Sequence, residues 1–247
     1  LPEVPLSLRP AAVVPGEARP YDAAMESDGL LLSRYRGPEP RPPDNVGLRL
    51  AMERQIPLVY LYGIVQGEYL AMWPVYVVGD DPAELCFKVA VDDRKLGALA
   101  PSGADVAAEA RRSYVTRVTV QRLHQEAFRQ RVLRAYRERC AICRLRHAEL
   151  LEAAHILPDG HPRGEPIVPN GLALCTLHHA AFDRHIVGIR PDLVIEVRRD
   201  ILEETDGPML LHGLQEIAGD SISAPRSERL RPRADFLEER YEIFRKA

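Results

Sequence analysis

Lysine is nearly absent from this sequence: three of its 33 basic residues are lysines, and the other thirty are arginines. Cysteine is also scarce, with four in 247 residues, which excludes a disulfide-rich secreted scaffold. The longest apolar run, IPLVYLYGIV at 56–65, is too short to cross a bilayer, so we expect no membrane association. No basic segment leads into an apolar stretch near residue 1, so we expect no secretory signal and a cytoplasmic protein.

The arginines are unevenly distributed along the chain. The formal net charge is −3, yet residues 111–146 contain eleven arginines against two glutamates and no lysine, a local net charge of +9. Such a segment suits phosphate contacts, and the alternative is a solvated helix face in an arginine-rich protein. We predict an Arg-rich helical connector at 106–136 and phosphate contacts from Arg129, Arg134 and Arg137.

The first hundred residues favour β-structure. Two β-branched and aromatic runs, PLVYLYGIV and YLAMWPVYVV, flank the turn QGE and predict a hairpin, and ELCFKVAV at 84–91 predicts a third strand. We therefore expect an α+β protein with a mostly-β N-terminal domain at 1–105. The hairpin aromatics Tyr60, Tyr62, Tyr69 and Trp73 either belong to the core, as strand aromatics usually do, or line a pocket that stacks on a base.

The segment at 140–183 holds three of the four cysteines and five of the eight histidines. Cys140 and Cys143 form a CxxC pair, and Cys175 and His178 form a second pair after 31 intervening residues. Two such pairs are typical of a structural Zn²⁺ site with four tetrahedral ligands, and the alternative is that the cysteines are buried as small apolar residues. Metal-ligand spacing also favours a reducing compartment.

Three further side chains in this segment do not belong to the zinc pairs. The stretches EAAHILP, VPNGLALC and HHAAFD contain His155, Asn170 and His179. From about residue 137 to residue 191 the chain resembles the HNH endonucleases, and with its upstream helix it looks most like the Mcr-type, modification-dependent restriction endonucleases. The resemblance implies a zinc-stapled ββα-metal nuclease domain at 137–220, followed by a C-terminal tail helix at 221–247.

Phosphodiester hydrolysis needs an activated water, a neutralised phosphate and a stabilised leaving oxygen. A neutral imidazole can accept a proton at cytosolic pH, so we expect His155 to be the general base. We expect His179 to ligate a catalytic cation, Mg²⁺ or another divalent ion, with Asp183 one helical turn later as the second ligand. Asn170 is expected to pin its loop and to orient His155.

One position departs from the family pattern. Many HNH nucleases carry an Asp directly before the catalytic His, whereas this chain has Ala154, so the metal would depend on His179, Asp183 or water, with His185 as a substitute ligand.

The main hypothesis is a metal-dependent endonuclease of a restriction system that acts on double-stranded DNA. The resemblance implies that the N-terminal domain, as a PUA-like barrel, reads a modified base such as a modified cytosine. A homodimer would supply the two sites that a double-strand break requires. The alternatives are a non-catalytic zinc module that binds nucleic acid and a partner-binding protein whose Arg-rich helix faces solvent.

Overall fold

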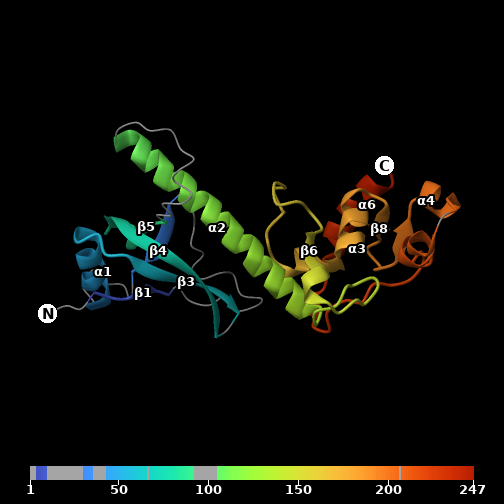
Figure 1. Cartoon of the computed structure of the whole chain (residues 1–247), viewed down its shortest axis with the longest axis horizontal. Helices are drawn as coiled ribbons and strands as arrows, with labels where there is room; N and C mark the ends of the chain where they lie inside the picture. The colour runs from blue at the N-terminus through green and yellow to red at the C-terminus, as the bar shows by residue number, and fades with distance from the viewer. Residues whose placement is uncertain (1–3, 10–29, 36–42, 66, 92–104, 206) are drawn as a thin grey trace. The chain divides into compact units, whose positions relative to one another are not determined.

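The computed structural model describes residues 4–9, 30–35, 43–65, 67–91, 105–205 and 207–247. By its internal contacts the chain divides into two compact units, Leu1–His124 and Gln125–Ala247. The division falls inside one long helix, α2 (Asp105–Ala135), which is green in Figure 1. The predicted domain boundary at 105 adjoins residues 92–104, which lie outside the described ranges. No helix in those ranges is long and apolar enough to span a bilayer.

The first unit is built on a sheet of five strands in the order β1-β3-β4-β5-β2. Its elements are β1 (Ser7–Leu8), β2 (Leu31–Arg34), α1 (Pro43–Glu53), β3 (Leu58–Val65), β4 (Glu68–Asp81) and β5 (Cys86–Val91). β3 and β4 form the predicted hairpin, and Gly67 in its turn has a φ of 86°, a conformation that favours glycine. The third predicted strand is β5, which pairs antiparallel with β4 and β2. Both predictions are confirmed.

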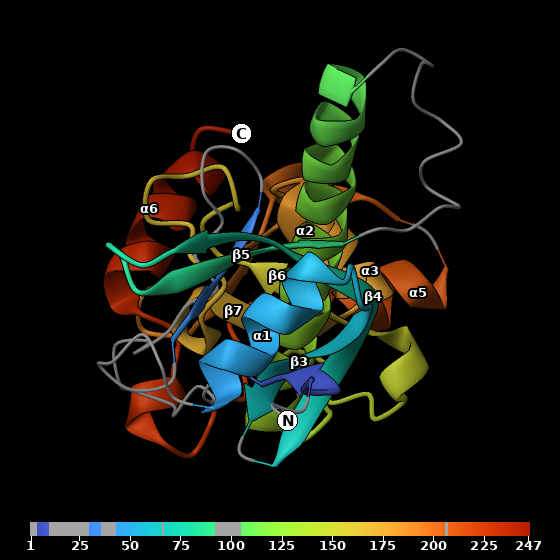
Figure 2. The same cartoon turned by 90° about the vertical axis from the view of Figure 1, so that its left-hand side faces the viewer.

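This sheet is open. Its edge strands, β1 and β2, do not pair with each other in the described residues, and β1 has only two residues. Closure would require hydrogen bonds between the two edges, and so short a strand offers few of them. The α+β class is confirmed, whereas the closed PUA-like barrel is not found in the described part of the unit. Helix α1 packs against β4 (Figure 2).

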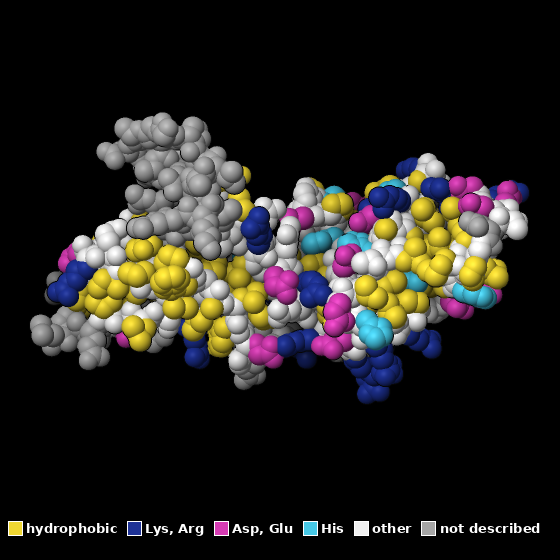
Figure 3. Space-filling model, in the orientation of Figure 1, with side chains coloured by type: hydrophobic (Ala, Val, Ile, Leu, Met, Phe, Trp, Pro, Cys, Tyr) yellow, Lys and Arg dark blue, Asp and Glu magenta, His cyan; other side chains and the backbone are white. Residues whose placement is uncertain are grey.

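The hairpin aromatics are divided between the two faces of the sheet. Tyr60 and Tyr62 are buried on one face of β3. Tyr69 lies opposite Gly63 in the neighbouring strand and so belongs to the other face, and Trp73 is 67% exposed. The four therefore do not line one pocket, and Tyr60 and Tyr62 belong to the core. Hydrophobic side chains nevertheless gather on the visible face of this unit (Figure 3).

The second unit contains the Cys/His segment and has a ββα arrangement at its centre. β6 (Leu151–His155) pairs antiparallel with β7 (Gly171–Cys175), and helix α3 (Thr176–Asp183) follows β7 directly. The other elements are η2 (Ala148–Leu150), η3 (Val168–Asn170), β8 (Val187–Ile189), β9 (Ile195–Val197), α4 (Arg199–Glu203), α5 (Pro208–Leu210), η4 (Leu211–Gln215), η5 (Glu228–Leu230) and α6 (Ala234–Phe244). β8 and β9 form a second hairpin, and α6 is the predicted terminal helix.

One hydrophobic core joins the end of α2, the β6–β7 hairpin, α3, β8, β9 and α6. All five residues of β7 are buried, which explains its apolar sequence GLALC. Two glycines permit the closest approaches. A Cβ at Gly171 would lie 2.5 Å from a methyl group of Val132, and one at Gly188 would lie 2.5 Å from the ring of Phe244. Helix α2 therefore packs directly on β7, and α6 packs directly on β8.

Candidate active site

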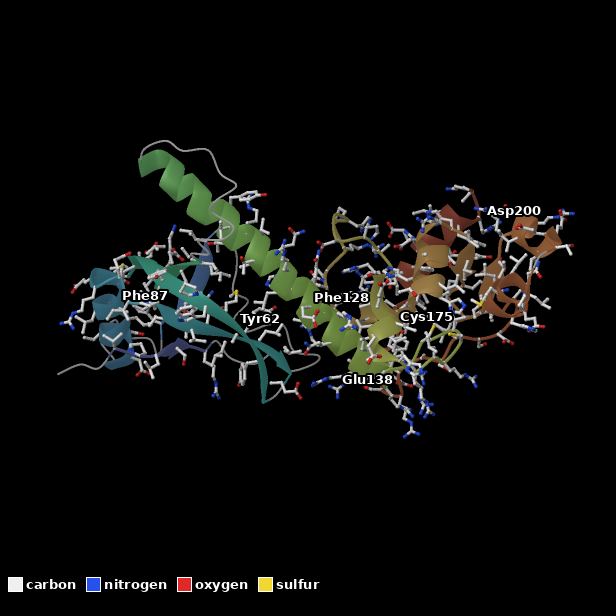
Figure 4. All side chains as sticks on the ribbon, in the orientation of Figure 1. Tyr62, Phe87, Phe128, Glu138, Cys175 and Asp200 are labelled. Carbon is white, nitrogen blue, oxygen red and sulfur yellow. The ribbon has the colours of Figure 1, made fainter. Side chains whose placement is uncertain are left out.

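Four sulfur and nitrogen donors gather at the base of the β6–β7 hairpin. Cys140 and Cys143 come from the loop after α2, Cys175 from the end of β7 and His178 from the first turn of α3, and their donor atoms all lie within 4.8 Å of one another. His178 Nδ1 is 3.1 Å from Cys175 Sγ and 3.5 Å from Cys140 Sγ. The four ligands predicted from the spacing thus form one Cys/His cluster, in which Figure 4 labels Cys175.

The Cys/His cluster has the chemistry of a structural zinc site. His178 Nε2 lies 2.8 Å from the Gly213 carbonyl, which can only accept, so Nε2 carries the proton and Nδ1 is free to bind a metal ion. Hydrogen bonding with Cys143 and Cys175 holds the pKa of the Cys140 thiol well below its usual range, as a thiolate ligand requires. Three sulfurs and one imidazole are a donor set that Zn²⁺ occupies in structural sites, so these residues fit that ion.

His155 ends strand β6, opposite Gly171 in β7. Its ring stacks on Phe128 of α2, with the ring centroids 4.2 Å apart and the planes inclined by 19°. Burial lowers the pKa of His155 from its ordinary value of 6.5, and the charge of Asp159 opposes the shift. Nε2 is enclosed and has no hydrogen-bond partner among the described residues, so an imidazolium would be poorly stabilised there. Burial therefore favours the neutral form of the His155 imidazole.

Asn170 is completely buried and holds the loop between β6 and β7. Its Oδ1 accepts a hydrogen bond from Leu157 N at 2.9 Å, and its Nδ2 donates to Leu157 O at 3.0 Å and to Glu165 O at 3.1 Å. The backbone carbonyl of Asn170 accepts from Ile156 N at 2.9 Å. These bonds fix the two residues that follow His155. Asn170 therefore holds the backbone that follows His155, and no hydrogen bond joins the two side chains among the described residues.

His179 follows the cluster ligand His178 directly but contacts a different set of side chains. Its Nδ1 is 2.5 Å from Glu152 Oε2 in β6, and its Nε2 is 3.2 Å from Asp183 Oδ2, one helical turn later. Electrostatic interaction with His179 lowers the pKa of His155, and interaction with Asp183 raises it. These side chains therefore belong to one site, formed by the end of β6 and one face of α3.

His179 and Asp183 fit a hard divalent cation as two protein ligands. The 3.2 Å between their facing atoms is close to the roughly 3 Å that separates neighbouring ligands in an octahedron around Mg²⁺. Among the described residues, the Cys/His cluster is the only group of three or more metal-binding side chains whose donor atoms meet. Mg²⁺ commonly takes its remaining ligands from waters and phosphates. Burial and the charge of Arg240 lower the pKa of His185, the predicted substitute ligand.

The arginines predicted to contact phosphate differ in their surroundings. Arg129 donates through Nη2 to the carbonyl groups of Ala148 and Leu151, at 2.9 and 3.1 Å, and so ties α2 to the start of β6. Arg134 and Arg137 are exposed. The structure thus gives Arg129 a structural contact and leaves two of the three predicted arginines on the surface.

Arg137 also lines a hollow of about 300 Å³ at the end of α2. Arg139 and Arg144 line the same hollow, together with small or aromatic residues, and its wall contains no carboxylate. The structure shows no ion pair for these three arginines with any other described residue. In Figure 4 nitrogen-rich side chains gather near the labelled Glu138. The hollow is therefore a local concentration of positive charge, which suits phosphate groups.

Residues 140–190 match the family model of the HNH endonucleases. We call residues 140–190 the HNH segment. The HNH segment spans the Cys/His cluster, the β6–β7 hairpin and α3, and it contains His155, Asn170 and His179. The resemblance inferred from EAAHILP, VPNGLALC and HHAAFD is confirmed for this part of the chain.

Among solved structures, the chain is similar to a protein described as "Modification dependent TagI restriction endonuclease". The two are 16% identical with a TM-score of 0.31, and the match covers 84% of this chain and 67% of that chain. No curated protein matches the sequence.

Two residues that contact His179 and Asp183 were not predicted from the sequence. Glu152 lies in EAAHILP, two residues before position 154, and strand alternation places both positions on one face, so a signal for it was present. Arg240 in α6 donates to Phe182 O at 3.1 Å, lies 4.8 Å above the Phe182 ring, and approaches Asp183 Oδ1 to 3.6 Å. No local pattern indicates Arg240, because it reaches the site from a helix far along the chain.

Proposed function

We propose that this protein is a metal-dependent endonuclease that hydrolyses phosphodiester bonds in double-stranded DNA. The observation that carries the proposal is His155, a neutral imidazole at the end of β6 beside His179 and Asp183, within the HNH segment. A non-catalytic zinc module would need only the Cys/His cluster. It would not need a second set of metal-binding side chains on the same helix.

His155 acts as the general base. Its Nε2 is enclosed, so Nδ1 is the ring nitrogen that can take a proton from a water molecule. Its lowered pKa keeps the ring unprotonated at neutral pH, and the stack on Phe128 fixes the ring plane. Asn170 holds the loop that follows and so preserves the position of the base.

Two metal ions with different roles are part of the proposal. Zn²⁺ in the Cys/His cluster holds the α2 end, β7 and α3 together. His179 and Asp183 would bind Mg²⁺ or another divalent cation, which when bound neutralises charge on the phosphate and on the leaving oxygen. Arg240 lies beside Asp183 and restrains that carboxylate.

The DNA backbone is bound by the exposed Arg134 and Arg137 and by the other arginines of the hollow. Backbone contacts carry no sequence information, so recognition has to come from another part of the chain. We assign it to the N-terminal unit and propose that this unit reads a modified base, as an enzyme of a restriction system would. The supporting observation is Trp73, whose exposed ring can stack on a base.

The proposal includes two copies of the chain for a double-strand break. One HNH site cuts one strand, so a single bound copy produces a nick. A homodimer would place a site on each strand, and a monomer would have to bind twice.

A plasmid assay tests this function. Supercoiled plasmid, unmodified or carrying modified cytosine, is incubated with the protein and Mg²⁺, Mn²⁺ or EDTA, with His155→Ala as the matched control. We expect cutting with either metal ion, none with EDTA or the variant, and faster cutting of modified plasmid. Binding without cutting under every condition would support the non-catalytic zinc module instead. Equal cutting of both plasmids would remove only the modified-base proposal.

A further inference from the structure

His179 is held between two carboxylates that approach opposite edges of its ring. Glu152 Oε2 lies 2.5 Å from Nδ1, and Asp183 Oδ2 lies 3.2 Å from Nε2. Asp183 belongs to the same helix as His179, whereas Glu152 comes from strand β6. The contact of Glu152 with His179 therefore joins the strand that carries the base to the helix that carries the proposed metal ligands.

Strand β6 offers this helix one carboxylate, and it comes from Glu152. Residues 152 and 154 project from the same face of the strand because side chains alternate, and residue 154 is a buried alanine without a donor atom. The longer side chain of Glu152 reaches His179 from two residues further back. It is only partly exposed, and its Oε2 is engaged with the ring.

We propose that Glu152 is a positioning residue that sets the tautomer and the orientation of His179; this rests on the proposed nuclease function. Both carboxylates can only accept a hydrogen bond, and Glu152 lies nearer to its ring nitrogen, at 2.5 Å against 3.2 Å for Asp183, so the proton of the neutral ring lies on Nδ1. The lone pair then lies on Nε2, the nitrogen that faces Asp183. A cation bound by Nε2 and Asp183 is on the far edge of the ring from Glu152, so Glu152 does not ligate it in this arrangement. A carboxylate that accepts a hydrogen bond from the other ring nitrogen of a histidine ligand raises the basicity of that ligand and fixes the orientation of its ring.

The test compares Glu152→Ala, Glu152→Gln and the matched control Glu149→Ala in the full zinc-loaded chain. Glu149 is an exposed carboxylate three residues earlier, in η2, and the structure shows no contact between it and His179. Two readouts are used: the affinity for Mn²⁺ measured by titration, and the tautomer of His179 measured by nitrogen NMR without added Mn²⁺ or DNA.

We expect Glu152→Ala to weaken Mn²⁺ binding by about 10- to 100-fold, the range typical for the loss of such a supporting carboxylate. Its His179 ring should become a mixture of tautomers. Glu152→Gln should show a smaller loss, because the amide oxygen still accepts from Nδ1, and Glu149→Ala should behave as wild type.

Two outcomes would overturn the proposal. An unchanged tautomer and unchanged Mn²⁺ affinity in Glu152→Ala would show that Glu152 positions nothing. An equal loss in Glu152→Gln and Glu152→Ala, with the tautomer retained in both, would make Glu152 a direct metal ligand. If the wild-type chain neither binds Mn²⁺ nor cuts DNA, the proposed function fails, and the tautomer measurement still decides the role of Glu152.

Discussion

His178 and His179 are neighbours on one helix, and their rings have two different kinds of surroundings. His178 is 1% exposed, and its two ring nitrogens face a pair of sulfurs and a backbone carbonyl. His179 is only partly buried, and its ring nitrogens face two carboxylates that themselves reach solvent. Structural zinc sites are closed by four protein ligands, whereas catalytic metal sites keep positions open for water and substrate. Under the proposed function, one turn of helix α3 therefore carries both a closed structural ligand and an open catalytic ligand.

Replacing the two histidines one at a time should have the largest effects, and the two variants should differ from each other. His178→Ala should lose zinc and unfold the second unit, since binding of a structural zinc is worth roughly 10–16 kcal/mol in zinc-finger peptides. His179→Ala should keep its zinc and its fold but lose cleavage. Elemental analysis and thermal unfolding followed by circular dichroism measure both effects. A wild-type protein that contains no zinc and is indifferent to strong chelators would contradict this prediction.

His155→Ala should have the next largest effect, and only on catalysis. Removal of a general base lowers the rate by about 100- to 10,000-fold. Zinc content, thermal stability and DNA affinity should stay close to wild type, because His155 is not a ligand in the Cys/His cluster. Single-turnover cleavage and a DNA-binding titration make the measurement. Cleavage near the wild-type rate would remove His155 from the mechanism.

The arginines in the last turns of α2 and just after it should show the same division between support and function. Arg137→Ala should weaken DNA binding whatever the sequence and reduce the slope of log affinity against log salt by about one unit. Arg129→Ala should instead lower the stability by about 1–3 kcal/mol, because the carbonyl groups of Ala148 and Leu151 lose a charged donor. An unchanged salt slope for Arg137→Ala would show that this side chain faces solvent and does not contact phosphate.

The smallest expected effect is a shift in pH dependence. The cleavage rate should rise with pH as His155 loses its proton, with the midpoint below the ordinary pKa of about 6.5 because burial lowers it. Below that ordinary value the unfolded chain takes up this proton more readily than the folded one, so His155 reduces stability as the pH falls. Phe128→Leu, which loosens the stack, should move the midpoint towards 6.5. A midpoint at or above 6.5 in wild type would show that burial does not control this base.

Sequence reasoning succeeded where a few neighbouring residues contain the whole signal. The two Cys/His pairs are each four residues long, and their meeting follows from the usual construction of a zinc site. The hairpin of β3 and β4 is marked by its turn and by its flanking β-branched runs. Neither prediction required knowledge of what packs against the segment.

Contacts between distant segments could not be predicted from the sequence. Arg129 and Arg137 lie on the same stretch of arginines, and only the packing of α2 on β6 distinguishes the structural one from the exposed one. The faces of Tyr62 and Tyr69 depend on the register of the hairpin, which strand propensity does not specify. The closed barrel was taken from a resemblance, and the short edge strands do not provide the pairing that it requires.

The HNH segment depends on contacts from residues outside its limits. This dependence matters when the segment is moved into another protein. Gly213 fixes His178, and Ser223 N donates to Ala141 O at 2.7 Å, although both contacts come from beyond residue 190. Helix α6 adds further side chains to the same core. A fragment of residues 140–190 would carry the metal-binding side chains into a fusion protein without the contacts that orient them. The smallest fragment that keeps these contacts therefore runs from the last turns of α2 to the end of α6.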